Sequence, residues 1–243
     1  MLPKARIKFV KSLQIKKYRK QEQLFLVQGA KSVMELLKSA FEVVMIVGTD
    51  DYLKKINVPK TAEVFEANES ELSTLGDFQA NESLVAVARM KPNYPINIGE
   101  EEFGLVLDDI RDPGNLGTII RTADWYGITK IIASEETVDF YNSKVITSTM
   151  GSFSRVEVYY TDLGSYLDKS TQKVFGAYLE GENIHEVSFG KGGIILIGNE
   201  SRGISPSLDR YITDKITIPR FGAAESLNAA IATAVICDNL RRR

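Results

Sequence analysis

The sequence has one cysteine, Cys237, and one histidine, His185, among its 243 residues. A single cysteine excludes an intramolecular disulfide and any zinc site built from several cysteines, and we expect no metal cofactor. Cys237 falls within an apolar helical pattern, so it is expected to be a small core residue. His185 lies in a polar stretch without a second histidine, which predicts an exposed loop residue rather than a catalytic base.

Long apolar runs are also lacking. No segment approaches the ~18–20 apolar residues of a membrane span, and the basic N-terminus is not followed by the apolar core of a signal peptide. These absences predict a cytoplasmic protein with no membrane partner.

Residues 1–20 contain no acid, although the whole chain has a net charge of −2. Such a run is either the solvated face of a helix or an arm that binds nucleic acid. The spacing of Ile7, Val10 and Leu13 predicts an amphipathic helix whose cations point outward. The cations of this run are Lys4, Arg6, Lys8, Lys11, Lys16, Lys17, Arg19 and Lys20.

The glycine fingerprints of common nucleotide-binding proteins are missing. The one dense glycine cluster, residues 189–193, precedes a predicted strand instead of joining a strand to a helix. No GxxxxGK[ST] phosphate loop is found either. A Rossmann dinucleotide site and a P-loop are therefore excluded.

What the sequence does contain is one arrangement that occurs three times. Residues 105–128, 194–205 and 218–240 each have an apolar strand end followed by glycine and by Asn or Glu, and the first and last continue into a helix. Open α/β sheets bind their ligands at the carboxyl ends of strands. In the last segment Pro219 ends the strand, and Ser226 is the predicted N-cap of the helix that follows.

Alternating strands and helices predict an α/β fold in two domains. Residues 1–92 have short units typical of a small α/β domain, and residues 103–243 form the larger domain. The stretch 91–102 between them has two prolines, a glycine and three acids with little apolar content, which predicts a linker over residues 93–102. The strands expected in the larger domain cover residues 103–108, 130–133, 155–159, 173–178, 194–197 and 215–218. The most apolar of them are typical of a sheet covered on both faces.

Three sequence motifs carry a family resemblance. NLGTIIRTA (115–123), IGNESRGIS (197–205) and IPRFGAAESLNAAIA (218–232) resemble, in order and spacing, the motifs of the SpoU (TrmH) branch of the SPOUT RNA methyltransferases. LFLVQGAKSVMELL (24–37) resembles the substrate-binding domain that precedes the catalytic domain in many of these enzymes, a fold shared with ribosomal proteins. The resemblance implies a deep trefoil knot, S-adenosylmethionine as cofactor, RNA as substrate and a homodimer formed through the knotted domain.

The resemblance also implies roles for individual residues. The catalytic residues would be Arg121, Glu200, Asn228 and Ser226. The cofactor would be bound by Ile197, Gly198, Asn199, Gly203, Ile218, Pro219, Gly222, Ser226 and Leu227. The RNA would be bound by Asn115, Arg121, Lys16, Lys17, Arg19 and Lys20. One departure is Arg220, where the family often has an apolar residue beside the cofactor loop.

Arg121 is the strongest catalytic candidate, because it lies off the apolar stripe of its helix and has no acid four residues away. Trp125 and Tyr126 are expected to be packing residues of the same helix, with base stacking as the alternative. The predicted activity is methylation of a ribose 2′-hydroxyl in ribosomal or transfer RNA. A ribosome-assembly factor that kept the fold without catalysis, and a SPOUT enzyme that methylates a base nitrogen, are the alternatives.

Overall fold

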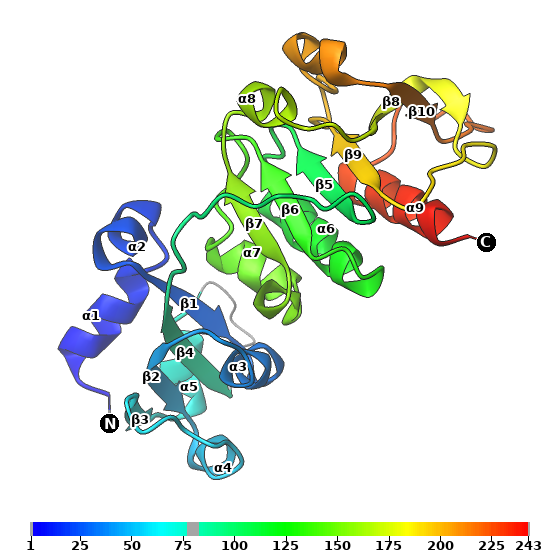
Figure 1. Ribbon diagram of the computed structural model, residues 1–243. Coiled ribbons are helices and arrows are strands. Elements are labelled where there is room, and N and C mark those ends of the chain that lie inside the picture. The colour runs from blue at the N-terminus through cyan, green and yellow to red at the C-terminus, as the bar shows by residue number, and fades with distance from the viewer. Residues whose placement is uncertain (1, 77–82, 243) are drawn as a thin grey trace. The chain divides into compact units, whose positions relative to one another are not determined.

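The computed structural model describes residues 2–76 and 83–242, and they form two compact units. Unit 1 comprises residues 1–92 and 139–154, and unit 2 comprises residues 93–138 and 155–243. Figure 1 shows the course of the chain. The division follows contacts rather than chain order, since a segment from the middle of the chain belongs to unit 1. The predicted bounds of the two domains and the linker stay a prediction.

Unit 1 is built on a four-stranded sheet with the order β1-β4-β2-β3. β4 is antiparallel to both of its neighbours, and β3 is parallel to β2. The strands are β1 (Leu24–Gln28), β2 (Val43–Gly48), β3 (Glu63–Glu66) and β4 (Leu84–Arg89). The helices are α1 (Lys4–Ser12), α2 (Lys16–Glu22), α3 (Ala30–Leu37), α4 (Asp50–Leu53), α5 (Glu69–Ser73) and α7 (Ser143–Ser148).

Two apolar groups cover the sheet of unit 1. Val10 of α1 and Leu13, which directly follows α1, pack with Leu26, Val47 and Val85 in a buried core, as the apolar spacing at the N-terminus predicted. An aromatic cluster forms around Phe25, whose ring centroid lies 4.7 Å from that of Tyr141 and 6.2 Å from that of Phe153. Tyr141 and Phe153 belong to the inserted segment 139–154, which explains why that segment folds with unit 1.

Unit 2 contains a six-stranded, all-parallel sheet with the order β10-β8-β9-β5-β6-β7. Its strands are β5 (Phe103–Leu107), β6 (Lys130–Ala133), β7 (Glu157–Tyr160), β8 (Val174–Asn183), β9 (Gly193–Ile197) and β10 (Asp214–Thr217). The central strands β5 and β9 are buried at every position, as expected for a sheet covered on both faces. The predicted α/β fold is therefore confirmed. Each predicted strand is present with ends within two residues of those expected, except that β8 continues to Asn183 instead of ending at residue 178.

The longer helices of unit 2 are α6 (Pro113–Trp125) and α9 (Ala229–Arg241), which pack against each other. The shorter ones are α8 (Leu163–Leu167) and the 3₁₀ turn η2 (Pro206–Tyr211), and a second 3₁₀ turn, η1 (Ser152–Ser154), lies in unit 1. The predicted linker packs on unit 2, because the side-chain amide of Asn93 donates to the carbonyl of Tyr160 at 2.8 Å and Ile98 is buried.

Candidate functional site

Neighbouring strands β9 and β5 end beside each other, and their loops carry two of the three motifs. The side-chain amide of Asn115, in the first turn of α6, donates to Oε1 of Glu200 at 2.5 Å. The Oδ1 atom of Asn115 accepts from the amide of Asn228 at 2.9 Å. A carboxylate and two amides from three distant segments thus form one continuous hydrogen-bonded chain, which we call the motif cluster.

Each member of the motif cluster is fixed by the end of a helix or by a loop. Asp112 caps α6 by accepting from the backbone N–H of Asn115 at 2.8 Å. Asn228 caps α9, since its Oδ1 accepts from the backbone N–H groups of Ala230 and Ile231 at 2.9 and 3.3 Å. The prediction that Ser226 caps this helix is wrong. The chain is irregular and exposed at Ser226, and the helix begins after Asn228, whose side chain accepts from the free N–H groups of the first turn.

Arg121 is exposed on α6, as its position off the apolar stripe predicted. It lies six residues beyond Asn115, which is about 9 Å along the helix axis. Among the residues that the structure describes, its guanidinium has no hydrogen bond or ion pair with the motif cluster or with an acid. Its donors are therefore available to a ligand.

The loop after β9 is closed tightly upon its own backbone. Asn199 and Gly203 exchange two backbone hydrogen bonds, of 3.0 and 2.9 Å. A Cβ atom on Gly198 would lie 2.2 Å from the carbonyl carbon of Gly203, so that position requires glycine. Gly203 itself has a φ of +69° with no heavy atom within 4 Å of an added Cβ.

The loop between β10 and α9, in contrast, is open and exposed. No heavy atom lies within 4 Å of a Cβ added to Gly222, and residues 220–228 are all exposed. Leu227 is 47% exposed and Phe221 98% exposed, so exposed apolar side chains lie beside exposed backbone. Backbone N–H and C=O groups next to apolar side chains are what an adenosyl group needs, and the residues present fit such a cofactor.

Asp109 is a residue that the sequence analysis missed. It follows β5 with a left-handed φ of +56° and is 8% exposed. Its carboxylate accepts from Nε of Arg111 at 2.7 Å and from Nη2 of Arg202, and its carbonyl accepts from the side-chain amide of Asn199 at 2.8 Å. Asp109 therefore ties the loops of the first two motifs together. The sequence Asp-Asp-Ile-Arg-Asp after a strand could have suggested a turn, since aspartate tolerates a left-handed conformation. It could not have suggested the hydrogen-bond partners of Asp109.

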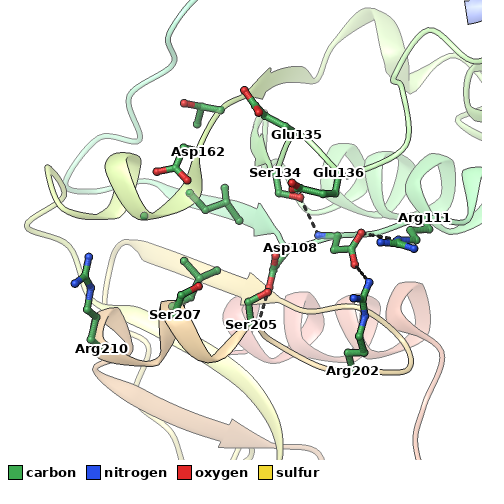
Figure 2. Close-up of a pocket in the computed structure, with 15 residues that line it drawn as sticks. Asp108, Arg111, Ser134, Glu135, Glu136, Asp162, Arg202, Ser205, Ser207 and Arg210 are labelled. Atoms are coloured by element: carbon green, nitrogen blue, oxygen red, sulfur yellow. Dashed lines mark hydrogen bonds and ion pairs between the residues drawn. The ribbon is translucent and has the colours of Figure 1, made fainter.

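A polar cavity of about 500 Å³ opens at the carboxyl ends of β5, β6 and β7. Figure 2 shows Arg111 and Arg202 at one end of it and Arg210 at the other. Its charged lining comprises five carboxylates and three guanidinium groups, from Asp108, Asp109, Glu135, Glu136, Asp162, Arg111, Arg202 and Arg210. Asp109 raises the pKa of the Arg111 guanidinium through their hydrogen bond.

The four N-terminal cations expected to bind RNA divide into two groups. Lys16, Lys17 and Lys20 are exposed, as predicted. Arg19 is not: its side chain is 2% exposed, and Nη2 lies 2.6 Å from Oδ2 of Asp139 while Nη1 donates to the carbonyls of Leu13 and Gln14. The expectation that Arg19 points outward to bind RNA is therefore wrong, and the reason is an ion-pair partner far away in sequence.

Two further predictions concern aromatic and histidine side chains. Trp125 is the last residue of α6 and is 83% exposed, so the expectation of a packing residue is wrong. His185 is exposed, as expected, and its Nδ1 lies 3.0 Å from Oδ1 of Asn239. In the described residues we find no helix able to span a membrane and no cluster of side chains suited to a metal ion.

An all-parallel sheet with glycine-rich loops and a fixed polar cluster at its strand ends defines an α/β enzyme that binds a small cofactor at these loops. The chain belongs to the SpoU rRNA methylase family, whose model matches residues 102–238. Residues 4–86 match the MRM3-like substrate binding domain. The predicted family and fold class are thereby confirmed, although the knot itself stays a prediction.

Individual relatives cover nearly the whole chain. The chain is 30% identical over 240 residues to the 23S rRNA (guanosine(2553)-2′-O)-methyltransferase RlmP of Bacillus subtilis, covering 97% of this chain and 96% of the relative. A TrmH-family protein from Porphyromonas gingivalis is 38% identical, with a TM-score of 0.89 over 99% of this chain and 98% of its own. An AdoMet-bound rRNA methyltransferase from Sinorhizobium meliloti is 29% identical, with a TM-score of 0.88 over 99% and 95%. The predictions of an RNA 2′-O-methyltransferase and of S-adenosylmethionine as its cofactor are confirmed.

Proposed function

We propose that this enzyme methylates the ribose 2′-hydroxyl of a guanosine in 23S ribosomal RNA. The observation that carries the proposal is the motif cluster, in which Glu200, Asn115 and Asn228 join all three motif segments through hydrogen bonds of 2.5 and 2.9 Å. The choice of ribosomal RNA and of guanosine is supported by the likeness to RlmP over almost the full length of both chains. This substrate favours the cytoplasm as the place of action.

The cofactor would be held by the loops after β9 and β10. The residues proposed to hold it are Ile197, Gly198, Asn199, Gly203, Ile218, Pro219, Gly222, Ser226 and Leu227. When bound, S-adenosylmethionine supplies an activated methyl group on its sulfonium. The chain's own contribution is to hold the loops at a fixed separation, and this is what the hydrogen bonds of Asn115 to Glu200 and Asn228 do.

Arg121 is proposed to act on the attacking oxygen. A guanidinium stays protonated in proteins, so it is poorly suited to removing the hydroxyl proton. Its fixed fork of donors is well suited to stabilising the oxyanion that develops as the proton leaves to a substrate phosphate or to water. Ser226, exposed and close in sequence to Asn228, is proposed to contact the substrate or the cofactor rather than to cap the helix.

RNA selection is proposed for unit 1. Lys16, Lys17 and Lys20 lie within or at the edge of one short helix and are exposed, so they could neutralise adjacent phosphates. Arg19 is excluded from this set by its buried ion pair with Asp139.

A homodimer is proposed to form through α9. Ile231 in the first turn of this helix is an apolar residue that is 52% exposed, and a two-fold contact would bury it. Sedimentation should give a dimer at micromolar concentration, and Ile231→Asp should dissociate it. A stable monomer of the unmodified protein would contradict the proposal.

The activity is tested by mapping ribose methylation in total RNA from a deletion strain and its parent. We expect one 23S rRNA guanosine to lose its methyl group and the purified enzyme to restore it in vitro. An unchanged map together with normal binding of ribosomal RNA would favour the non-catalytic assembly factor. A lost base methylation with intact ribose methylation would favour the base-methylating alternative.

A further inference from the structure

Arg111 and Arg202 share one acceptor. Arg111 donates through Nε to Oδ1 of Asp109, and Arg202 donates through Nη2 to Oδ2 of the same carboxylate. The Asp109 side chain is only 12% exposed, whereas those of Arg111 and Arg202 are 64% and 63% exposed. A mostly buried carboxylate therefore fixes two guanidinium groups whose outer edges face solvent.

Most donors of the two guanidinium groups remain unused. A guanidinium has five N–H donors. Arg111 and Arg202 each use one of them in a hydrogen bond to Asp109. Within the part of the chain that the structure describes, neither side chain has another hydrogen bond or ion pair. Figure 2 shows both arginines reaching toward the same end of the cavity. Their free donors thus form a preorganised site for an anion with two or more oxygens.

Each arginine of the pair lies close in sequence to a residue of the motif cluster. Arg111 lies four residues before Asn115, and Arg202 lies two residues after Glu200. The loop that carries Arg202 is held in place by Asn199, whose Oδ1 accepts from the backbone N–H groups of Ser201 and Arg202 at 2.9 and 3.1 Å. A group bound by the pair is therefore held in fixed relation to the motif cluster.

The charge of the surroundings limits which anion fits. Carboxylates outnumber guanidinium groups in the cavity lining, so a general positive field does not draw a polyanion inward. Recognition must rest on the fixed fork geometry at one end of the cavity, which suits a single phosphodiester group. RNA carries such a group on either side of every ribose.

We propose that Arg111 and Arg202 together bind one phosphodiester group of the substrate RNA beside the target ribose. This inference rests on the proposed function, because it takes RNA as the substrate. The pair would set the register of the RNA strand over the motif cluster, while Asp109 keeps the two side chains apart and extended.

The test uses the full-length enzyme with unmodified 23S rRNA transcribed in vitro as the probe. The variant Arg111→Gln/Arg202→Gln should raise the KM for RNA by roughly 10- to 100-fold, as expected for lost charged hydrogen bonds. The salt dependence of RNA binding should become shallower by about one unit of slope. The affinity for S-adenosylmethionine, measured by calorimetry, and the kcat at saturating RNA should stay within about threefold of the parent values, since each base-independent phosphate contact acts on binding.

Arg210→Gln is the matched control, because Arg210 lines the other end of the same cavity and its guanidinium bonds the hydroxyl of Tyr211 instead of Asp109. It removes one guanidinium charge from the same cavity, against two in the double variant, and should leave both KM and salt slope unchanged. Arg111→Lys/Arg202→Lys keeps the charges and the ion pairs with Asp109 but loses the forks, so it should restore the KM only in part.

Three outcomes would overturn the inference. One is a parental KM and salt slope in the Gln double variant. Another is complete rescue by the Lys double variant, which would show a requirement for charge alone. The third is a loss of cofactor affinity in place of RNA affinity, which would assign the pair to the cofactor's carboxylate. Because the salt dependence of RNA binding is measured without turnover, it can be read even if the unmodified enzyme transfers no methyl group, which is how failure of the proposed function would appear.

Discussion

The polar residues predicted to be functional are arranged differently in unit 1 and unit 2. In unit 2, Asn115 contacts Glu200 and Asn228 across sequence separations of 85 and 113 residues. In unit 1, Lys17, Arg19 and Lys20 are close in sequence, yet Arg19 is buried while the lysines are exposed. Closeness along the chain thus says little about a shared role, whereas a repeated strand-loop-helix arrangement in a parallel sheet places distant side chains together.

The largest expected effect comes from removing the exposed guanidinium of Arg121 in unit 2. Arg121→Ala should lower turnover by roughly 10²–10³-fold, the loss seen when one preorganised oxyanion donor is removed. Cofactor binding should stay nearly intact, and Arg121→Lys should recover only part of the rate. Steady-state kinetics with calorimetric cofactor titration checks this. An Arg121→Ala enzyme with parental kcat would leave Arg121 as an ordinary surface residue.

The buried guanidinium of unit 1 should behave in the opposite way. Arg19→Gln leaves the Asp139 carboxylate without its charged partner, and breaking such a buried pair costs about 3–5 kcal/mol of stability. Urea unfolding should show this loss, with Lys17→Gln as the control that stays at the parental midpoint. Equal midpoints for the two variants would mean that the ion pair contributes nothing.

The exposed cations of unit 1 should affect binding alone. Lys16→Gln/Lys17→Gln/Lys20→Gln should weaken RNA binding and make its salt slope shallower by about 2 to 3 units, because three phosphate contacts are lost. Fluorescence anisotropy over a series of salt concentrations measures both quantities. If neither changes, these lysines form only a solvated helix face.

The smallest effect is expected at Cys237 in α9. Burial raises the pKa of its thiol to about 12, so the reactive thiolate is scarce near neutral pH. We expect no alkylation of the folded enzyme by iodoacetamide at pH 8 and full alkylation in denaturant. Rapid labelling of the native protein would show that this helix opens.

The features of the fold that could be predicted are those that the local pattern of apolar residues determines. Strands β5 and β9 are apolar at nearly every position, and only a sheet covered on both faces accommodates such runs. The motif residues Asn115, Glu200 and Asn228 could be placed near one another because each follows a strand end or begins a helix. Their hydrogen-bond order could not be predicted, since it depends on side-chain geometry.

Features that depend on distant partners escaped sequence reasoning. Burial of Arg19 requires Asp139, which is 120 residues away. The left-handed Asp109 and its two arginines depend on how the loops after β5 and β9 meet. The segment 139–154 joins unit 1 through the ring contacts of Tyr141 and Phe153 with Phe25, which no local periodicity announces.

The central claim is that the motif region of unit 2 performs the chemistry while the lysines of unit 1 contribute only affinity. Single-turnover methyl transfer at saturating S-adenosylmethionine and saturating 23S rRNA tests it most directly, with Arg121→Ala and the Lys16/Lys17/Lys20 triple Gln variant measured side by side. The account predicts a parental rate for the triple variant and a roughly 10²–10³-fold slower rate for Arg121→Ala. A slow triple variant beside a parental Arg121→Ala would contradict it.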